Sequence, residues 1–156
     1  MIFQPSKPVT LSVPYIEQRY PGECLAACAA MVIEYLNLHT STLQKRKVRY
    51  SYRQLLRVLQ IKRHVGTPFS QIQRLDRLKL NIAYETQGEL ETLYELLVAG
   101  WPPIVAVQTE ELPHWNGVSS MHTIVVIGMD SEFIYVNDPE FPDIPIPIPI
   151  GEFDLA

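Results

Sequence analysis

Cys24 is the residue of this chain whose position points most directly to chemistry. It lies between a turn-like stretch over 18–23 and an apolar run over 25–36 that is long enough for a buried helix. A thiol at the start of a helix faces unpaired backbone N–H groups and the positive end of the helix dipole. Both favour the thiolate, which is the nucleophilic form of cysteine. The position of Cys24 therefore predicts a reactive thiol.

Three further side chains could complete a site for nucleophilic catalysis. Gln18 lies six residues upstream of Cys24, and His122 opens a later apolar strand, whereas Asp138 follows Asn137 at the end of the next strand. A histidine can take the proton of the thiol, a carboxylate can fix the tautomer of that histidine, and an amide can hold an oxyanion. Asn137 is an alternative to Asp138, because neighbouring strand residues point to opposite faces and only one of the two can face the histidine.

The same residues have interpretations without catalysis. A cysteine at the edge of an apolar helix can be a small buried hydrophobe, and Cys28, one turn further on, is predicted to be part of the core. His122 could be a structural histidine and Gln18 a surface residue. Asp138 before Pro139 is a common turn starter. The ordered set favours catalysis over these separate interpretations.

The cysteine pattern predicts free thiols. Cys24 and Cys28 share one helix face, but Cβ atoms at that spacing are about 5–6 Å apart, whereas a disulfide needs about 3.8 Å. With a histidine they would form a zinc site of unusual spacing that lacks a fourth ligand. We therefore predict no disulfide, no metal and no cofactor. The other histidines are predicted to be surface or loop residues, namely His39, His64 and His114, and His114 with Trp115 could line the rim of a cleft.

Composition limits the classes of function. The chain has 156 residues, of which 47% are hydrophobic and 19% charged, which suits one globular domain over 1–156. The net charge is −4 and the cationic stretch at 45–49 is short, so nucleic acid is not a predicted partner. The chain shows neither a membrane span nor a signal peptide, which predicts a cytoplasmic protein. Its oligomeric state is not indicated.

The apolar pattern predicts the elements that must position these residues. The run over 24–38 is apolar nearly all round, which is typical of a helix buried at the centre of a fold. Further helices are predicted over 52–60 with Ser51 as cap, 68–77 and 90–98, and strands over 80–84, 103–108, 123–128 and 133–136. The last two strands are close enough for a hairpin. Helices followed by an antiparallel sheet indicate an α+β fold.

Finer signals mark the ends of these elements. Thr86 and Glu89 have the spacing of a capping box before the helix at 90, and Gly100 is expected to end that helix. Residues 1–12 form an extended lead-in, and residues 140–156 form a proline-rich C-terminal segment. Within it, proline at every second position over 144–150 fits an edge strand or polyproline II but not a central strand.

Taken together, these residues resemble the C39-like cysteine peptidases, which have a papain-like fold. The resemblance rests on Gln18, Cys24 and the Ala-rich helix start, then on 100–105, 121–130 and 135–139, and it covers roughly 11–155. It implies a central buried helix packed on an antiparallel sheet and a cysteine peptidase acting on a peptide or protein. It also implies the roles of four residues: Cys24 as nucleophile, His122 as base, Asp138 as orienting group and Gln18 as oxyanion-hole donor.

The chain departs from the family pattern in two places. Leu25 stands where the family often has glycine, and a branched side chain there could crowd the cleft, which favours a catalytically weak peptide-binding module as an alternative. The best-known members cut leader peptides after a double glycine, usually as a domain fused to an exporting ABC transporter, whereas this sequence shows no membrane or ATPase segment, so a leader-peptide role is not expected. A thioester intermediate could also pass to an amine, so acyl transfer stays open beside hydrolysis. The cationic stretch at 40–50 suggests acidic peptides as substrates.

Overall fold

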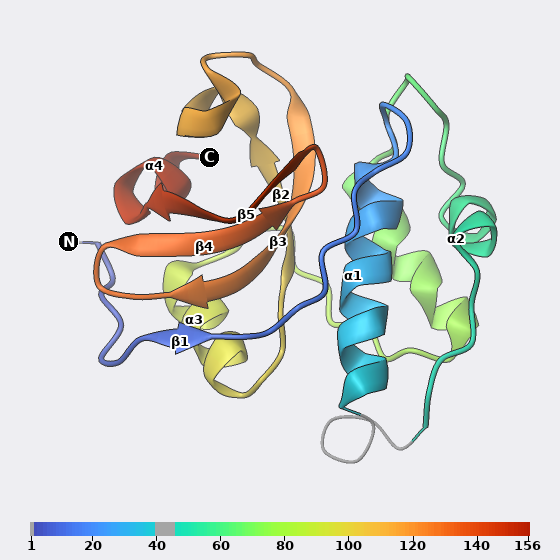
Figure 1. The fold of residues 1–156 in the computed structure, drawn as a ribbon, viewed down its shortest axis with the longest axis horizontal. Helices are drawn as coiled ribbons and strands as arrows, with labels where there is room; N and C mark the ends of the chain where they lie inside the picture. The colour runs from blue at the N-terminus through green and yellow to red at the C-terminus, as the bar shows by residue number, and fades with distance from the viewer. Residues whose placement is uncertain (1, 40–45) are drawn as a thin grey trace.

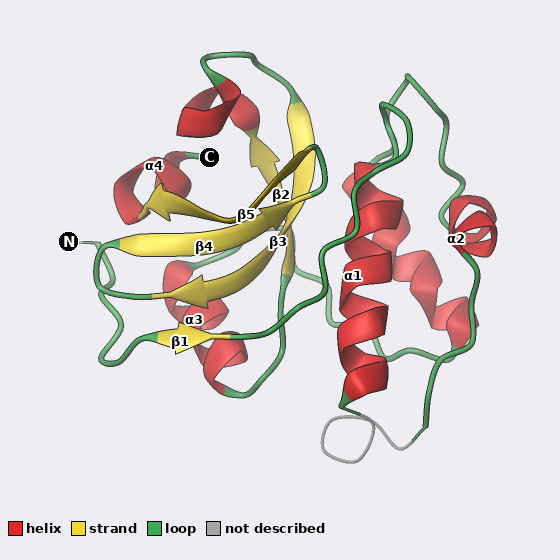
Figure 2. Ribbon diagram, viewed as in Figure 1, coloured by secondary structure: helices red, strands yellow, loops and turns green. Residues whose placement is uncertain are grey.

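Residues 2–39 and 46–156 are described by the structure, a computed structural model, which has a helical side and a sheet side (Figure 1). Helix α1 (Cys24–Leu38) lies between the sheet and two shorter helices, α2 (Tyr52–Val58) and η1 (Phe69–Leu78) (Figure 2). The predicted α+β fold, with a central helix packed on an antiparallel sheet, is confirmed. Across the described residues, the structure has no helix that is both long and apolar enough to cross a membrane.

Helix α1 begins and ends at the predicted residues. One face packs in a hydrophobic cluster with α2 and η1, where Leu25 and Ile33 meet Leu55 and Leu75. The other face packs on the sheet, where Met31 lies in a cluster with Val125. Because both faces are covered, the helix must be apolar all round. Its four alanines are almost completely buried, and their small side chains let the neighbouring elements approach closely.

Strand β3 (Met121–Met129) is the centre of the sheet. One edge pairs antiparallel with β2 (Ile104–Gln108) and, further along, with β1 (Val9–Thr10), while the other edge pairs with β4 (Phe133–Asp138). Strand β5 (Phe141–Pro149) pairs with β4 on the outside. A Cβ at Gly128 would lie 2.8 Å from the carbonyl oxygen of Val9, so the close pairing of β1 needs glycine at this position.

The proline-rich segment is an edge strand, which confirms one of the two predicted forms. Ile146 and Ile148 are buried and pair with β4, whereas Pro145 and Pro147 are exposed. Prolines have no N–H group, so their edge of β5 cannot donate to a further strand. Helix α4 (Ile150–Leu155) follows directly and packs against the sheet side.

Two predicted local structures are wrong. Residues 80–84 form no strand. Their alternation reflects burial alone, since Leu80, Ile82 and Tyr84 pack on the helical cluster while no neighbouring strand is there to pair with them. Helix α3 (Leu90–Val98) begins without a capping box, because Glu89 is its N-cap residue and makes no side-chain cap bond.

Other predicted ends of helices agree with the structure. Ser51 caps α2 by accepting a 3.1 Å hydrogen bond from the backbone of Gln54. Gly100 has φ +89° and follows the end of α3, where Trp101 N–H donates to the Leu96 carbonyl, as in a Schellman motif. The predicted helix at 68–77 is a 3₁₀ helix, η1. Of the cationic stretch at 40–50, residues 40–45 lie outside the described residues, and residues 46–50 are in neither helix nor strand.

Candidate active site

Cys24 is the first residue of α1 and is partly exposed. The chain reaches it through a tight turn in which Gly22 has φ +86° and Glu23 N–H donates to the Tyr20 carbonyl at 3.2 Å. Glu23, the N-cap residue, makes no side-chain cap bond. The first N–H groups of α1 therefore stay free of a side-chain cap, and the positive end of the helix lies beside the thiol.

His122 and Asp138 come together across the sheet. His122 is near the start of β3 and Asp138 ends β4, and His122 Nε2 lies 2.7 Å from Asp138 Oδ1. Both side chains are buried. Asn137 instead donates to the Val13 carbonyl at 3.2 Å, so the alternation of the strand turns it away from the histidine. Of the two alternatives that the sequence leaves open, the structure places Asp138 against His122.

The pKa values of Cys24, His122 and Asp138 are shifted because these groups interact with one another. Burial raises the pKa of Cys24, but a hydrogen bond and the charge of His122 outweigh it and leave the thiol pKa below its usual value. Burial lowers the pKa of His122, but Asp138 and Cys24 raise it to about 9. Burial also opposes ionisation of Asp138, yet hydrogen bonds from His114 and His122 hold its pKa well below the usual range. Since Nε2 faces Asp138, Nδ1 is left for Cys24. The arrangement favours a thiolate–imidazolium pair.

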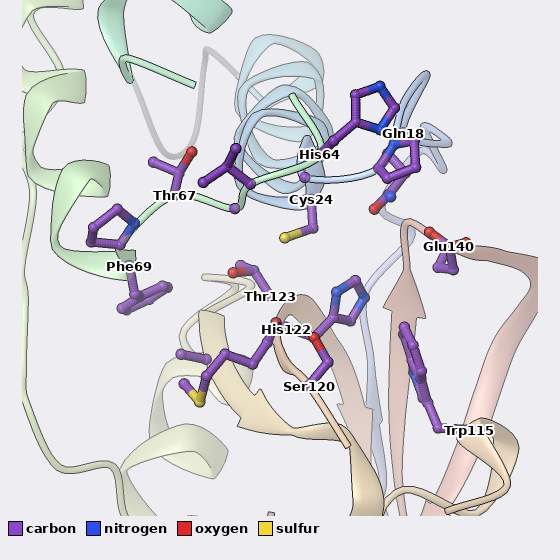
Figure 3. A pocket seen from close by; sticks show the side chains of 17 residues that line it. Gln18, Cys24, His64, Thr67, Phe69, Trp115, Ser120, His122, Thr123 and Glu140 are labelled. Carbon is purple, nitrogen blue, oxygen red and sulfur yellow. Dashed lines mark hydrogen bonds between the residues drawn. The ribbon is translucent and has the colours of Figure 1, made fainter. Parts of the chain in front are cut away.

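Gln18 is held next to this group by its backbone. Its N–H donates to the Pro139 carbonyl at 2.9 Å, directly after Asp138. Its side-chain amide makes one long bond, 3.4 Å, from Nε2 to the Tyr20 carbonyl, and Oε1 is buried with no partner among the described residues. Gln18 and Cys24 lie near one another on the same cleft (Figure 3).

This cleft, the Cys24 cleft, has a volume of about 800 Å³. Its helical wall is formed by Gln18, Cys24 and the loop over 64–69. Its sheet wall is formed by Ala106 and residues 120–123. Cys24 and His122 face one another across it from α1 and β3 (Figure 3). An open depression with a nucleophile between two walls can accept an extended peptide.

His114 and Trp115 both contact Asp138, a contact that the sequence did not predict beyond a place at the rim of a cleft. His114 Nε2 lies 2.8 Å from Asp138 Oδ2, and Trp115 Nε1–H donates to the same oxygen at 2.9 Å. The Trp115 ring also packs edge-on against the His122 ring, with centroids 4.9 Å apart. The sequence predicts His114 at the surface or in a loop, and the structure places it in a short 3₁₀ helix, η3 (Pro113–Trp115), with its side chain 16% exposed. Trp115 lines the cleft, as the alternative proposed, and His114 lies behind it against Asp138.

Glu23 is a second group that the sequence did not single out. Its side chain is fully buried, and its two carboxylate oxygens accept hydrogen bonds from Tyr52 at 3.1 Å and from Arg63 at 3.0 Å. In the same loop as Arg63, His64 N–H donates to the Pro21 carbonyl at 2.8 Å. The loop that forms the helical wall of the cleft is therefore tied to the turn that carries Cys24.

Leu25 does not crowd the cleft. It is 1% exposed and packs in the helical core with Leu55 and Leu59. It is also absent from the lining of the Cys24 cleft. The expectation that its branched side chain obstructs substrate is wrong, because a residue next to Cys24 on a helix points about 100° away from it.

The remaining predicted groups lie elsewhere. Cys28 is buried in the core, as predicted, and its thiol donates to the Thr123 carbonyl at 3.3 Å. Both cysteines are free. In the described part of the chain, no three His, Cys, Asp or Glu residues are grouped as a metal site would require. The described part of the cationic stretch, 46–50, does not line the Cys24 cleft.

Comparisons with known proteins identify the family and the fold of this chain. The model of the Peptidase C39-like family matches residues 10–144. The crystal structure of a Bacillus anthracis protein assigned as a C39-like peptidase superposes with a TM-score of 0.73 at 20% sequence identity, covering 97% of this chain and 92% of that one. At this identity the likeness shows the fold. No curated protein matches the chain by sequence.

Proposed function

Because the chain belongs to the Peptidase C39-like family, we propose that it is a cysteine peptidase that hydrolyses peptide bonds with Cys24 as the nucleophile. The observation that carries this proposal is the chain of contacts from Cys24 to His122 to Asp138 at the edge of an open cleft. Residues 1–156 would act as one catalytic domain, and the substrate would be a peptide or protein.

The first step is deprotonation of the Cys24 thiol. His122 Nδ1 takes the proton of Cys24, and Asp138 accepts the Nε2–H of the resulting imidazolium. The positive end of α1 and the imidazolium stabilise the thiolate. Asp138 keeps its negative charge throughout, because His114, Trp115 and the backbone of Glu140 all bond to its carboxylate. Asp138 thereby holds the His122 ring in one orientation.

The second step places negative charge on the substrate carbonyl oxygen. The thiolate forms a C–S bond and the carbonyl electrons move to oxygen, giving a tetrahedral oxyanion. The backbone N–H of Cys24 and the Nε2–H of Gln18 are the donors that would hold it. In comparable sites one such donor is worth about 2.7–4 kcal/mol. Within the described part of the chain, the Gln18 amide hydrogens make one bond, 3.4 Å long, so they can turn toward the oxyanion at small cost.

The last steps release both products. The His122 imidazolium gives its proton to the leaving amine as the C–N bond breaks, leaving a thioester on Cys24. His122 then takes a proton from water, whose oxygen attacks the thioester and releases the acid and the free thiolate. Trp115 covers the His122–Asp138 bond on the cleft side, so bulk water does not compete for it.

The test is alkylation of Cys24 by iodoacetamide against pH in the Cys28→Ala background, followed by a peptide-library digest. We expect fast alkylation well below pH 7 that is lost in His122→Ala, and peptide cleavage that is lost in Cys24→Ala. A free amine added to the digest separates hydrolysis from acyl transfer, since transfer gives the amide product. A single rise near an ordinary thiol pKa, unchanged in His122→Ala, would contradict the proposal.

A further inference from the structure

The charges of this chain are strongly divided along the sequence. All 13 Lys and Arg residues lie within 1–79, and residues 80–156 contain none. Residues 80–156 nevertheless hold 13 of the 17 Asp and Glu residues. The charges of the two parts largely cancel, so the net charge of the whole chain is only −4. Positive charge is therefore concentrated on the part of the chain that forms α1, α2 and η1.

Several of these cations converge at the C-terminal end of α1. They line a depression of about 900 Å³ that is separate from the Cys24 cleft, and here it is named the cationic depression. Its cations are Arg46, Lys47 and Arg49 from the segment after α1, and Arg77 and Lys79 from the end of η1. Trp101, which is 40% exposed, also lines it, together with Leu36, Val48, Leu78, Leu80 and Asn81.

The segments that meet there are anchored to the last turns of α1. The Asn37 side chain binds both backbone groups of Val48, accepting from its N–H at 2.8 Å and donating to its carbonyl at 3.0 Å. The Tyr35 hydroxyl donates to the Gly100 carbonyl at 2.8 Å, next to Trp101. The positions of the 46–49 segment and of Trp101 therefore follow from the framework of the fold.

Four cations of the cationic depression, namely Lys47, Arg49, Arg77 and Lys79, have no acidic partner in its described lining. No Asp or Glu is among the residues that the structure describes as its lining. Across the described chain, no salt bridge is formed by Lys47, Arg49, Arg77 or Lys79. The C-terminus of α1 contributes only about half an elementary negative charge. Such a cluster of like charges repels itself and attracts an anionic ligand.

We propose that the cationic depression binds an acidic polypeptide segment at a site distinct from the Cys24 cleft. Its cations are exposed on two chain segments, which suits an extended ligand, whereas small-molecule sites are enclosed and mostly apolar. The guanidinium groups of Arg49 and Arg77 can each bind a carboxylate through two hydrogen bonds. Leu36 lies 12 residues beyond Cys24, so the two sites are about 18 Å apart at ~1.5 Å per helical residue.

The test uses the Cys24→Ala chain, so that binding is measured whether or not the protein is a peptidase. The probe is a fluorescein-labelled hexaglutamate peptide followed by fluorescence anisotropy, with hexaglutamine as the neutral control. We expect hexaglutamate alone to bind, and its affinity to fall as salt rises. Arg49→Glu/Arg77→Glu should weaken binding at least tenfold. Arg53→Glu/Arg57→Glu on α2 makes the same change in net charge away from the depression and should keep near-normal binding.

Tryptophan emission gives a second readout that locates the ligand. The chain has two tryptophans, and Trp115 lies at the other site. Hexaglutamate should change the emission of the parent chain but not that of Trp101→Phe. Equal loss of binding in both double variants would show general electrostatics and overturn the proposal. Binding of inorganic tripolyphosphate without hexaglutamate binding would also overturn it, as would self-association that replaces hexaglutamate binding and depends on Arg49 and Arg77.

Discussion

In the proposed site, the helical side of the molecule would supply the nucleophile, and the sheet side would supply the base and its orienting group. Cys24 begins α1, whereas His122 and Asp138 belong to neighbouring strands and are already hydrogen-bonded to each other. The two sides also differ in their supports: Glu23 on the helical side ties the turn before Cys24 to a loop, while Asp138 on the sheet side accepts four hydrogen bonds. The sheet side is therefore the pre-organised half of the proposed site, and packing of α1 on β3 brings Cys24 to it.

The largest effect is expected from breaking the sheet side. Asp138→Asn keeps the size of the side chain but removes the charge that holds His122 in its orientation and raises its pKa. In a comparable triad such a change lowers kcat about 10⁴-fold, and we expect a loss of 10²–10⁴-fold in kcat/KM here. Steady-state cleavage of a peptide identified in the library digest measures it. A loss below fivefold would show that Asp138 does not orient the base.

The pH dependence of activity tests the Cys24 and His122 groups of the two sides separately. The thiolate–imidazolium pair exists between the lowered pKa of Cys24 and the raised pKa of His122, about 9. Activity should therefore rise with pH as Cys24 ionises and fall as His122 loses its proton near pH 9. In Asp138→Asn the basic limb should move toward the ordinary histidine pKa of about 6.5. A basic limb that stays near 9 in this variant would assign it to another group.

A smaller effect on activity is expected from the helical side. Glu23→Gln weakens the charged hydrogen bonds from Tyr52 and Arg63, and hydrogen bonds to charged groups contribute about 1.5–3 kcal/mol. Because Arg63 is 53% exposed, solvent screens its share, and we expect a loss of about 1–2 kcal/mol in unfolding free energy, measured by urea denaturation. Loosening of the loop over 64–69 should raise KM more than it lowers kcat. Arg57→Gln, at an exposed position on α2, is the control.

The smallest effect on activity is expected at Leu25. Its side chain is buried in the helical core, so Leu25→Ala should cost about 2–5 kcal/mol of stability through the cavity that it leaves. The folded variant should keep kcat/KM within about threefold, since Leu25 does not line the cleft. Activity assayed at a temperature where circular dichroism shows the variant folded separates the two effects. A gain of activity above tenfold in Leu25→Ala would show that Leu25 does obstruct substrate in the Cys24 cleft.

Much of the fold could be predicted because its signals are local. An apolar run of helical length defines α1, and two β-rich runs separated by a short polar stretch define the hairpin of β3 and β4. The false strand at 80–84 shows the limit of such signals. Alternating burial arises wherever an extended segment covers a core, but a strand also needs a partner, and only the assembled chain shows whether one is there.

The sequence predicts which residues could form the candidate site, but it predicts only some of the contacts between them. The sequence predicts Gln18, Cys24, His122 and Asp138 as site residues, and the structure brings them together at one cleft or directly behind it. The bonds of Asp138 to His114 and Trp115 span 24 and 23 residues and leave no pattern in the sequence. The division of charge was visible in the sequence, but its significance appears only when Arg49 and Arg77 line one depression.

The start of α1 at Cys24 and the central strands can be predicted from the sequence, because they depend on neighbours within a few positions. The sequence also indicates which residue types could form a thiol-based site. The tertiary structure decided that Asp138 rather than Asn137 faces His122, that Leu25 points into the core, and that Glu23 is buried with two partners. These outcomes depend on which faces of distant elements pack together. Burial and electrostatic coupling arise only when α1 docks on the sheet.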